Sequence, residues 1–205
     1  MGFVSVLSYA HQLIRQKVQP GESVIDATAG NGVDTLFLAS LVGPSGKVYG
    51  FDIQKEAIRH TRDRLAQELP SSALYVTLIQ DSHHRLTDYL PEQEQGKIAA
   101  AMFNLGYLPG AETRTITRPD TTLPALEAAL ASLRRGGILT VVLYPGHEGG
   151  REEADKVTRW AAELPQNLCQ VLEYRFLNRR SGSPYLLALE KNRQNDIMST
   201  GHTYI

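Results

Sequence analysis

Five short, mostly apolar runs recur along the chain and alternate with longer stretches of helical character. The runs are residues 23–27, 47–52, 73–80, 98–103 and 138–143. Continuous apolar character over so few residues is typical of strands that are buried on both faces, as in parallel sheets. The alternation therefore predicts an α/β fold in which these five strands are parallel.

Two of the intervening stretches carry apolar side chains at three- and four-residue spacing, so that each set lies on one face of a helix. The two sets are Ile58, Thr61, Leu65 and Leu69, and Leu123, Leu126, Leu130 and Leu133. Thr121 or Thr122 can cap the second helix, and Pro124 is tolerated in its first turn.

The end of the chain departs from this alternation. Residues 170–176 and 184–191 are strand-like, and the turn that joins them is too short for a crossover helix, so the two strands must pair antiparallel. Parallel strands closed by such a hairpin resemble the Rossmann-like sheet of class I S-adenosylmethionine (SAM)-dependent methyltransferases. That resemblance implies seven mostly parallel strands in the order 3-2-1-4-5-7-6. We expect residues 1–191 to form this single domain and residues 192–205 to form a polar tail.

Composition limits the remaining classes of protein. A chain of 205 residues with 42% hydrophobic and 21% charged residues suits one soluble domain. The single cysteine, Cys169, excludes an internal disulfide. No signal peptide or long apolar stretch is present, so we expect a cytoplasmic protein without a membrane partner. The formal net charge of −1 gives no global attraction to nucleic acid, so an RNA-binding surface would have to be a local patch.

A small-residue turn follows the first predicted strand. The strand ends at Asp26, and the sequence Ala-Thr-Ala-Gly-Asn-Gly leads to a helix that begins near Asp34. The turn lacks the Gly-x-Gly-x-x-Gly pattern of dinucleotide enzymes, and an acid at its head repels a pyrophosphate but attracts an ammonium group. It therefore indicates the amino-acid end of SAM. Asp26 and Asp34 are candidates for the ammonium, and Asn31 with nearby backbone amides is a candidate for the carboxylate.

The ends of the next two predicted strands complete this expected pocket. Asp52 stands where an acid receives the ribose hydroxyls in nucleotide pockets, and Ile53 and Gln54 would flank the ribose and adenine. The polar groups of residues 81–84 can reach the adenine edge. The predicted cofactor residues are Asp26, Gly30, Asn31, Gly32, Asp34, Thr35, Asp52, Ile53, Gln54, Ser82 and His83. An ordinary loop is the alternative for the turn. No metal site is predicted, because adjacent histidines diverge and no third ligand has a recognisable spacing.

The fourth predicted strand leads into Asn104-Leu-Gly-Tyr107. Nucleic-acid amine methyltransferases carry Asn/Asp-Pro-Pro-Tyr/Phe here, where the amide oxygen accepts a hydrogen bond from the target amine and the ring stacks on the base. Asn104 and Tyr107 match the first and fourth positions, whereas Leu105 and Gly106 replace the prolines. The motif favours a nitrogen target, and a turn asparagine capped by a packed tyrosine is the alternative.

Two further groups of residues complete the expected site. His147, after the fifth strand, is a candidate base for the amine proton, and a surface histidine without a role is the alternative. Basic residues after strand four and around the final hairpin can bind phosphates, unless they are only solvated loop arginines. The predicted catalytic residues are Asn104, Tyr107 and His147. The predicted substrate-binding residues are Arg114, Arg118, Tyr144, Arg179 and Arg180.

Taken in order, residues 26–35, 51–54, 82–83, 103–110 and 146–147 resemble the motifs of the YtqB/MnmM family, and the similarity extends from about residue 9 to 191. The resemblance implies SAM-dependent N-methylation of 5-aminomethyl-(2-thio)uridine at wobble position 34 of tRNA, which gives the 5-methylaminomethyl form, with the anticodon loop as partner. It also implies that the cofactor is held by Asn31, Asp34, Asp52, Gln54, Ser82 and His83.

The chain departs from the family pattern at three places. Val33 and Pro145 stand where relatives have histidine, and Gly182-Ser183-Pro184 replaces Asp-Pro-Pro. Three alternatives stay open: a methyltransferase of rRNA, a methyltransferase of small amines, and a SAM-binding protein without catalysis. A homodimer is also left open.

Overall fold

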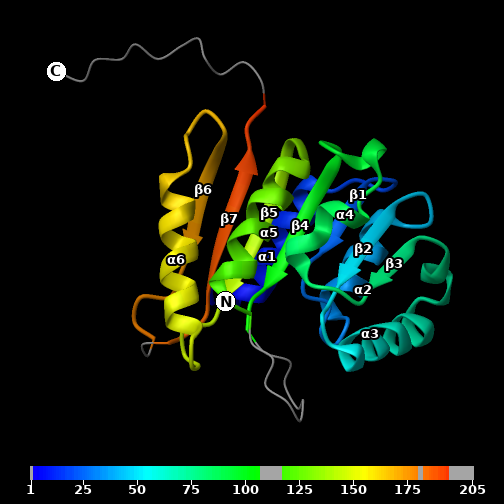
Figure 1. Cartoon of the computed structure of the whole chain (residues 1–205), viewed down its shortest axis with the longest axis horizontal. Coiled ribbons are helices and arrows are strands. Elements are labelled where there is room, and N and C mark those ends of the chain that lie inside the picture. The colour runs from blue at the N-terminus through cyan, green and yellow to red at the C-terminus, as the bar shows by residue number, and fades with distance from the viewer. Residues whose placement is uncertain (1, 107–116, 180–181, 194–205) are drawn as a thin grey trace.

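The computed structural model describes residues 2–106, 117–179 and 182–193. Within these ranges seven strands form one sheet (Figure 1). The strands are β1 (Ser23–Asp26), β2 (Lys47–Phe51), β3 (Val76–Ile79), β4 (Ile98–Asn104), β5 (Leu133–Leu143), β6 (Cys169–Tyr174) and β7 (Tyr185–Lys191). The α-helices are α1 (Val6–Lys17), α2 (Val33–Val42), α3 (Lys55–Glu68), α4 (Leu86–Tyr89), α5 (Pro119–Ser132) and α6 (Gly150–Glu163). No helix of the described ranges is both long and apolar enough to cross a membrane.

The strand order is β3-β2-β1-β4-β5-β7-β6, which confirms the predicted order. Strands β1 to β5 pair in parallel, whereas β7 is antiparallel to both β5 and β6. The carboxyl ends of the parallel strands therefore meet at one edge of the sheet, the lower edge in Figure 1. The turn between β6 and β7 returns to that same edge.

Helices cover both faces of the sheet. Helices α1, α2 and α3 pack on one face, and α4, α5 and α6 pack on the other. Neighbouring residues of a buried strand face opposite sides, so Val141 belongs to one apolar cluster and Val142 to the other. This two-sided burial explains why the strands are apolar throughout rather than alternating.

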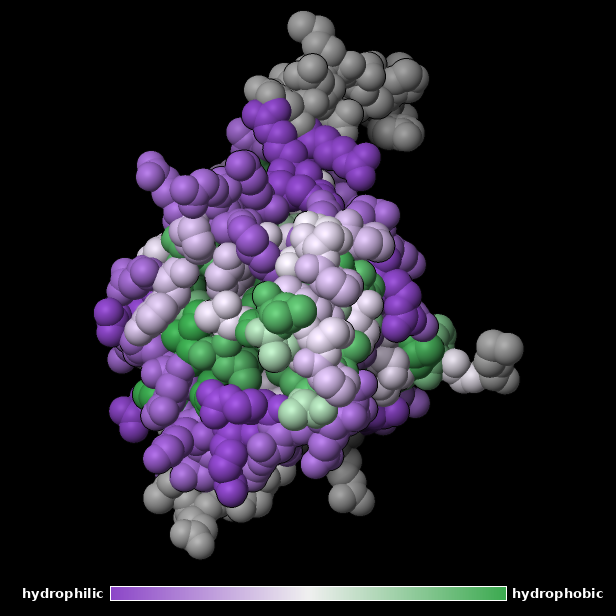
Figure 2. Space-filling view, turned by 90° about the vertical axis from the view of Figure 1, so that its right-hand side faces the viewer, coloured by the Kyte–Doolittle hydropathy of each residue, from purple (hydrophilic) through white to green (hydrophobic). Residues whose placement is uncertain are grey.

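The two ends of the sheet are edge strands, β3 and β6. Figure 2 shows the face on the β3 side, where apolar side chains gather between polar margins. Leu74, directly before β3, is 86% exposed. The predicted third strand, residues 73–80, is shorter in the structure, because Pro70–Leu74 forms a 3₁₀ turn that ends just before β3.

Helix α5 begins earlier than predicted. Pro119 occupies its first turn, and Arg118 precedes it without a side-chain cap, so the predicted caps Thr121 and Thr122 are wrong. The Thr122 hydroxyl instead donates a hydrogen bond to Glu153 Oε1 at 2.6 Å. Pro124 lies inside the helix rather than in its first turn. Proline at the first position is pre-organised for a helix start, which explains the shift.

We predict that Leu139→Ala lowers the free energy of unfolding by about 2–5 kcal/mol. Leu139 is fully buried in β5, where it is paired with Ala101 of β4 and Leu189 of β7. Removing its side chain leaves a cavity that the flanking strands cannot close. Chemical denaturation monitored by circular dichroism measures the change. The matched control is Leu74→Ala, for which we expect a change below about 0.5 kcal/mol. Equal losses in the two variants would contradict this description of the core.

Candidate functional site

The turn after β1 is built around a buried carboxylate. Asp26 is fully buried, and its oxygens accept hydrogen bonds from the Thr35 hydroxyl at 2.5 Å and the Thr28 backbone N–H at 3.1 Å. Gly32 has a φ of +77°, and a β-carbon there would lie 2.8 Å from the Thr61 Cα. Only glycine therefore lets the turn pass so close to α3. The carboxylate is enclosed within the turn, where both of its oxygens are hydrogen-bonded by the turn itself.

Asp52 follows β2 and binds the same turn. One oxygen accepts a hydrogen bond from the Gly30 N–H at 2.9 Å, and the other accepts one from the Gln54 N–H at 2.9 Å. Burial raises the pKa of this carboxyl above its ordinary value. The adjacent Ile53 is 56% exposed, which is unusual for a large apolar side chain. The acid and the isoleucine thus offer a polar and an apolar contact side by side.

The segment after β3 brings a histidine into contact with the turn after β1. His83 is buried and lies edge-on to the Phe103 ring at 5.7 Å. Burial lowers the pKa of His83 to about 4, and a hydrogen bond with the Ala27 backbone only partly opposes this. Its Nε2 atom is buried without a hydrogen-bond partner among the described residues. Ser82, next to it, shares a 2.8 Å hydrogen bond with His84. A neutral imidazole nitrogen is therefore available to a polar ligand edge.

Three carboxylates give this edge of the sheet a negative potential. Burial, and then the nearby charges of Asp34 and Asp52, raise the pKa of Asp26 to about 7. The side chain of Asp34 contacts His11, whose Nε2 lies 2.6 Å from the Asp34 Oδ1. His11 comes from α1 and stacks on Phe37 at 3.9 Å. The sequence patterns did not predict His11, because it lies 23 residues from its partner.

The end of β4 carries a buried acceptor. The Asn104 backbone N–H donates to the Thr28 hydroxyl at 2.8 Å, which ties β4 to the turn after β1. The Asn104 Oδ1 atom is buried and has no hydrogen-bond partner among the described residues. Burial and the charge of Asp34 raise the pKa of Tyr144, and a hydrogen bond with Asn104 opposes them. Asn104, Tyr144 and Asp34 are thus brought together.

His147 lies beside the same segment. A β-carbon at Gly106 would lie 3.6 Å from the Tyr144 ring and 3.9 Å from the His147 Nε2. The His147 Nδ1 atom is within 2.9 Å of the Glu148 carbonyl oxygen. The structure therefore brings His147 next to the residues after Asn104, where the sequence placed a candidate base.

Glu153 of α6 binds the start of α5 and the residue that leads into it. Its buried carboxylate accepts hydrogen bonds from the hydroxyls of Thr117 and Thr122, each at 2.6 Å. The Thr117 N–H also donates to the Gly106 carbonyl at 3.2 Å. This carboxylate was not predicted, because α6 showed no pattern that linked it to α5.

The remaining predicted residues are exposed or lie outside the described ranges. Asn31 is exposed, and its carbonyl accepts a hydrogen bond from Arg64 at 2.8 Å. Arg118 is exposed before α5, and Arg179 lies over the Phe176 ring. Tyr107, Arg114 and Arg180 lie outside the described residues. Among the described residues, no three histidines, cysteines or acids come together in a way that could hold a metal ion.

The chain is similar to proteins of one family. The family model described as "Putative rRNA methylase" matches residues 48–190. A relative from Arabidopsis thaliana, described as "tRNA (mnm(5)s(2)U34)-methyltransferase, chloroplastic", is 42% identical over 176 residues. The match covers 83% of this chain and 64% of the relative, so the chain spans less than two thirds of that protein's length.

Two crystal structures share the fold. One, described as a "putative rRNA-methylase" from Clostridium thermocellum, has a TM-score of 0.87 and 41% identity and covers 93% of this chain and 100% of its own. The other, described as a "putative methyltransferase" from Streptococcus mutans in complex with SAH, has a TM-score of 0.81 and 38% identity and covers 93% of this chain and 99% of its own. These similarities confirm the fold class predicted from the sequence.

We predict that His83 makes the protein less stable in mild acid. Between pH 6.5 and about 4 the unfolded chain takes up a proton on this ring while the folded chain does not, so the free energy of unfolding falls as the pH falls. His83→Asn keeps an N–H donor for the Ala27 carbonyl but does not titrate. The stability advantage of the unsubstituted protein over this variant should therefore shrink between pH 7 and pH 5.

Urea denaturation at the two pH values measures this difference. Asp26 has the opposite pH dependence, because its raised pKa makes the folded chain hold an extra proton between pH 3.8 and about 7. That contribution is common to both proteins and cancels in the difference. An advantage that stays constant between pH 7 and pH 5 would show that the buried ring does not titrate as described.

Proposed function

Because the chain belongs to the putative rRNA methylase family, we propose that it is a SAM-dependent N-methyltransferase that acts on tRNA. Its substrate is the amine of 5-aminomethyl-(2-thio)uridine at wobble position 34, and its product is the 5-methylaminomethyl form. The observation that carries the proposal is the buried Oδ1 atom of Asn104, which has no hydrogen-bond partner among the described residues and lies at the sheet edge that carries Asp26, Asp34 and Asp52. The activity named for the Arabidopsis relative supports the same substrate.

The residues at the strand ends fit SAM. The field of Asp26 and Asp34 favours the ammonium and sulfonium charges, and the Gly30–Gly32 turn leaves room for backbone to approach a ligand. Asp52 is placed to bind ribose hydroxyls, and the exposed Ile53 can pack against a flat base. The Streptococcus mutans structure in complex with SAH supports this cofactor. When bound, SAM supplies a methyl group activated by a sulfonium.

Asn104 would hold the amine that receives this methyl group. A buried carbonyl oxygen without a partner costs free energy, and an incoming N–H donor removes that cost. The hydrogen bond would orient the amine so that its lone pair faces the methyl carbon. Such positioning provides most of the rate enhancement in a displacement of this kind. An amine must be neutral to react. His147, beside Gly106, would take up the proton that the nitrogen releases.

The remaining features agree with an RNA substrate in the cytoplasm. A wobble base lies in a single-stranded loop, where its edge is accessible without opening a duplex. Arg118 and Arg179 are exposed and available for phosphate groups. The one cysteine, Cys169, is buried and free, which suits a reducing compartment.

The decisive experiment supplies the protein with methyl-labelled SAM and tRNA. One tRNA carries 5-aminomethyluridine at position 34, and the matched control tRNA lacks the aminomethyl group. We expect label only in the first, in a nucleoside with the mass of 5-methylaminomethyluridine. Label on rRNA or on small amines would show that the substrate differs from the one proposed. SAM binding without any methyl transfer would show that the protein is not a methyltransferase.

We predict that Asn104→Ala lowers kcat by about a hundredfold, because the amine loses the acceptor that orients it. The Kd for SAM, measured by calorimetry, should change by less than about threefold. Asn104→Asp keeps the size of the side chain but adds a charge that stabilises the protonated amine. Its residual activity should therefore have a higher pH optimum than that of the unsubstituted enzyme. Equal losses of kcat and SAM affinity in Asn104→Ala would show that Asn104 contributes to binding of the cofactor rather than to binding of the amine.

A further inference from the structure

A row of aromatic rings connects the start of the chain to the edge strand β6. The Tyr9 and Tyr174 rings are 4.4 Å apart, the Tyr174 and Phe176 rings 5.5 Å, and the Phe176 and Phe3 rings 6.4 Å. The Arg179 guanidinium lies over the Phe176 ring at 4.2 Å. Tyr9, Tyr174 and Phe176 pack against the core, whereas Phe3 is 88% exposed. The row therefore runs from the interior to the surface.

The position of Phe3 is fixed by its neighbours. The Tyr174 hydroxyl donates a hydrogen bond to the Val4 carbonyl at 3.0 Å, and the Ser5 side chain caps α1 through the Ser8 N–H at 3.1 Å. The residues on the C-terminal side of Phe3 are thus held against β6. An exposed phenylalanine on an anchored segment presents a ring at a defined place, and the hydrophobic effect alone would favour burying it.

This surface lies at the edge of the sheet that carries the candidate site. Leu143, the last residue of β5, pairs with Tyr185, the first residue of β7. A β-carbon at Gly146 would lie 2.7 Å from the Gly182 carbonyl oxygen, so the turn after β6 contacts the segment between Tyr144 and His147. Phe176 and Arg179 belong to the stretch that leads into this turn. A molecule bound at Asn104 and Tyr144 therefore extends toward these rings.

Charge distinguishes Arg179 from its neighbour Arg175. Arg175 forms an ion pair with Glu173 at 2.6 Å and covers the buried Tyr185 ring. Among the residues that the structure describes, no carboxylate lies within ion-pair distance of Arg179. The exposed guanidinium plane of Arg179, held over the half-buried Phe176 ring, offers both a stacking face and a phosphate contact.

We propose that Phe3, Phe176 and Arg179, here called the aromatic platform, stack an unpaired base of the RNA loop next to the nucleotide that carries the amine. The inference rests on the proposed function, because it takes the RNA loop to be bound at Asn104. Bases of single-stranded RNA stack on aromatic rings and guanidinium planes, and their phosphates favour an unpaired arginine. The positive charge of Arg179, which no described carboxylate pairs, favours RNA over an apolar protein partner.

The test uses the full chain and a stem-loop RNA with 5-aminomethyluridine in its loop and 2-aminopurine as the adjacent base. Stacking quenches the fluorescence of 2-aminopurine, so the signal reports the proposed contact directly. Phe3→Ala and Arg179→Ala should each raise the KM for RNA about tenfold and reduce the quench, with kcat and the Kd for SAM within about twofold. Phe3→Tyr should keep the quench, whereas Phe3→Leu, which retains an apolar side chain without a ring, should lose it.

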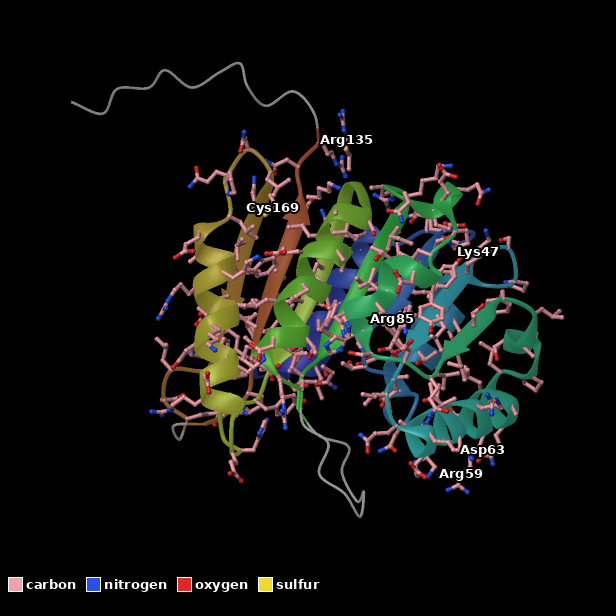
Figure 3. The ribbon with its side chains drawn as sticks, viewed as in Figure 1. Lys47, Arg59, Asp63, Arg85, Arg135 and Cys169 are labelled. Carbon is pink, nitrogen blue, oxygen red and sulfur yellow. The ribbon has the colours of Figure 1, made fainter. Side chains whose placement is uncertain are left out.

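Two substitutions at the far end of the molecule are the matched controls. Leu74→Ala removes another exposed apolar side chain, and Arg59→Ala removes an arginine that projects from α3, away from β6 (Figure 3). Neither should change the KM or the quench. Equal behaviour of Phe3→Leu and Phe3→Tyr, or an unchanged KM in Phe3→Ala, would overturn the platform.

The same experiment separates failure of the platform from failure of the proposed function. If the unsubstituted protein transfers no methyl group to any RNA, the proposed function fails, and a quench that depends on Phe3 still supports an RNA-stacking surface. If Phe3→Ala instead converts a dimer to a monomer in sedimentation, with RNA affinity unchanged, the surface is a contact between two copies of the chain and the platform is refuted.

Discussion

The buried carboxylate of Asp26 is the constraint around which this edge of the sheet is organised. Its hydrogen bonds to Thr28 and Thr35 close the turn after β1 and fix the start of α2. They lower its pKa, but burial and then the neighbouring acids outweigh them and raise the pKa to about 7, so the folded chain holds a proton on this carboxyl below that pH. A folded chain that keeps this carboxylate cluster out of water carries an electrostatic cost. A positively charged ligand removes part of that cost, so folding and ligand binding are thermodynamically linked here.

The same turn is also bonded to the end of β4. The Thr28 hydroxyl accepts a hydrogen bond from the Asn104 backbone, so one residue connects the turn to the end of β4. β4 lies between β1 and β5, and its last residue, Asn104, pairs with Val142 of β5 and is bonded to the turn after β1. An in-line displacement requires the two reacting atoms to be positioned within a fraction of an ångström. In the function that we propose, the turn that faces the cofactor and the acceptor of the amine lie on adjacent buried strands, which would meet that requirement without a moving part.

Residues next to strand ends could be predicted from the sequence, whereas contacts between distant helices could not. Asp26, Asp52 and Asn104 each stand where an apolar run ends, and parallel strands bring such positions to one edge. His11 and Glu153 lie on helices whose packing depends on the completed fold, so residue spacing gave no sign of their partners. The predicted cap of α5 failed because the helix begins at Pro119, which leaves Thr122 inside the helix, where its hydroxyl donates to Glu153.

The antiparallel hairpin that interrupts the α/β alternation has a consequence for recognition. β6 runs parallel to β5 and ends at the edge that carries the site. A parallel β7 would require a crossover that leads the chain away from that edge, but an antiparallel β7 needs only a short turn, which stays there. The turn therefore remains beside Tyr144 and His147, while Tyr174 holds the start of the chain against the same strand. The segment around Phe3 and the turn after β6 thus lie beside the candidate site without contributing to the turn that surrounds Asp26, so their sequences can vary without disturbing that turn.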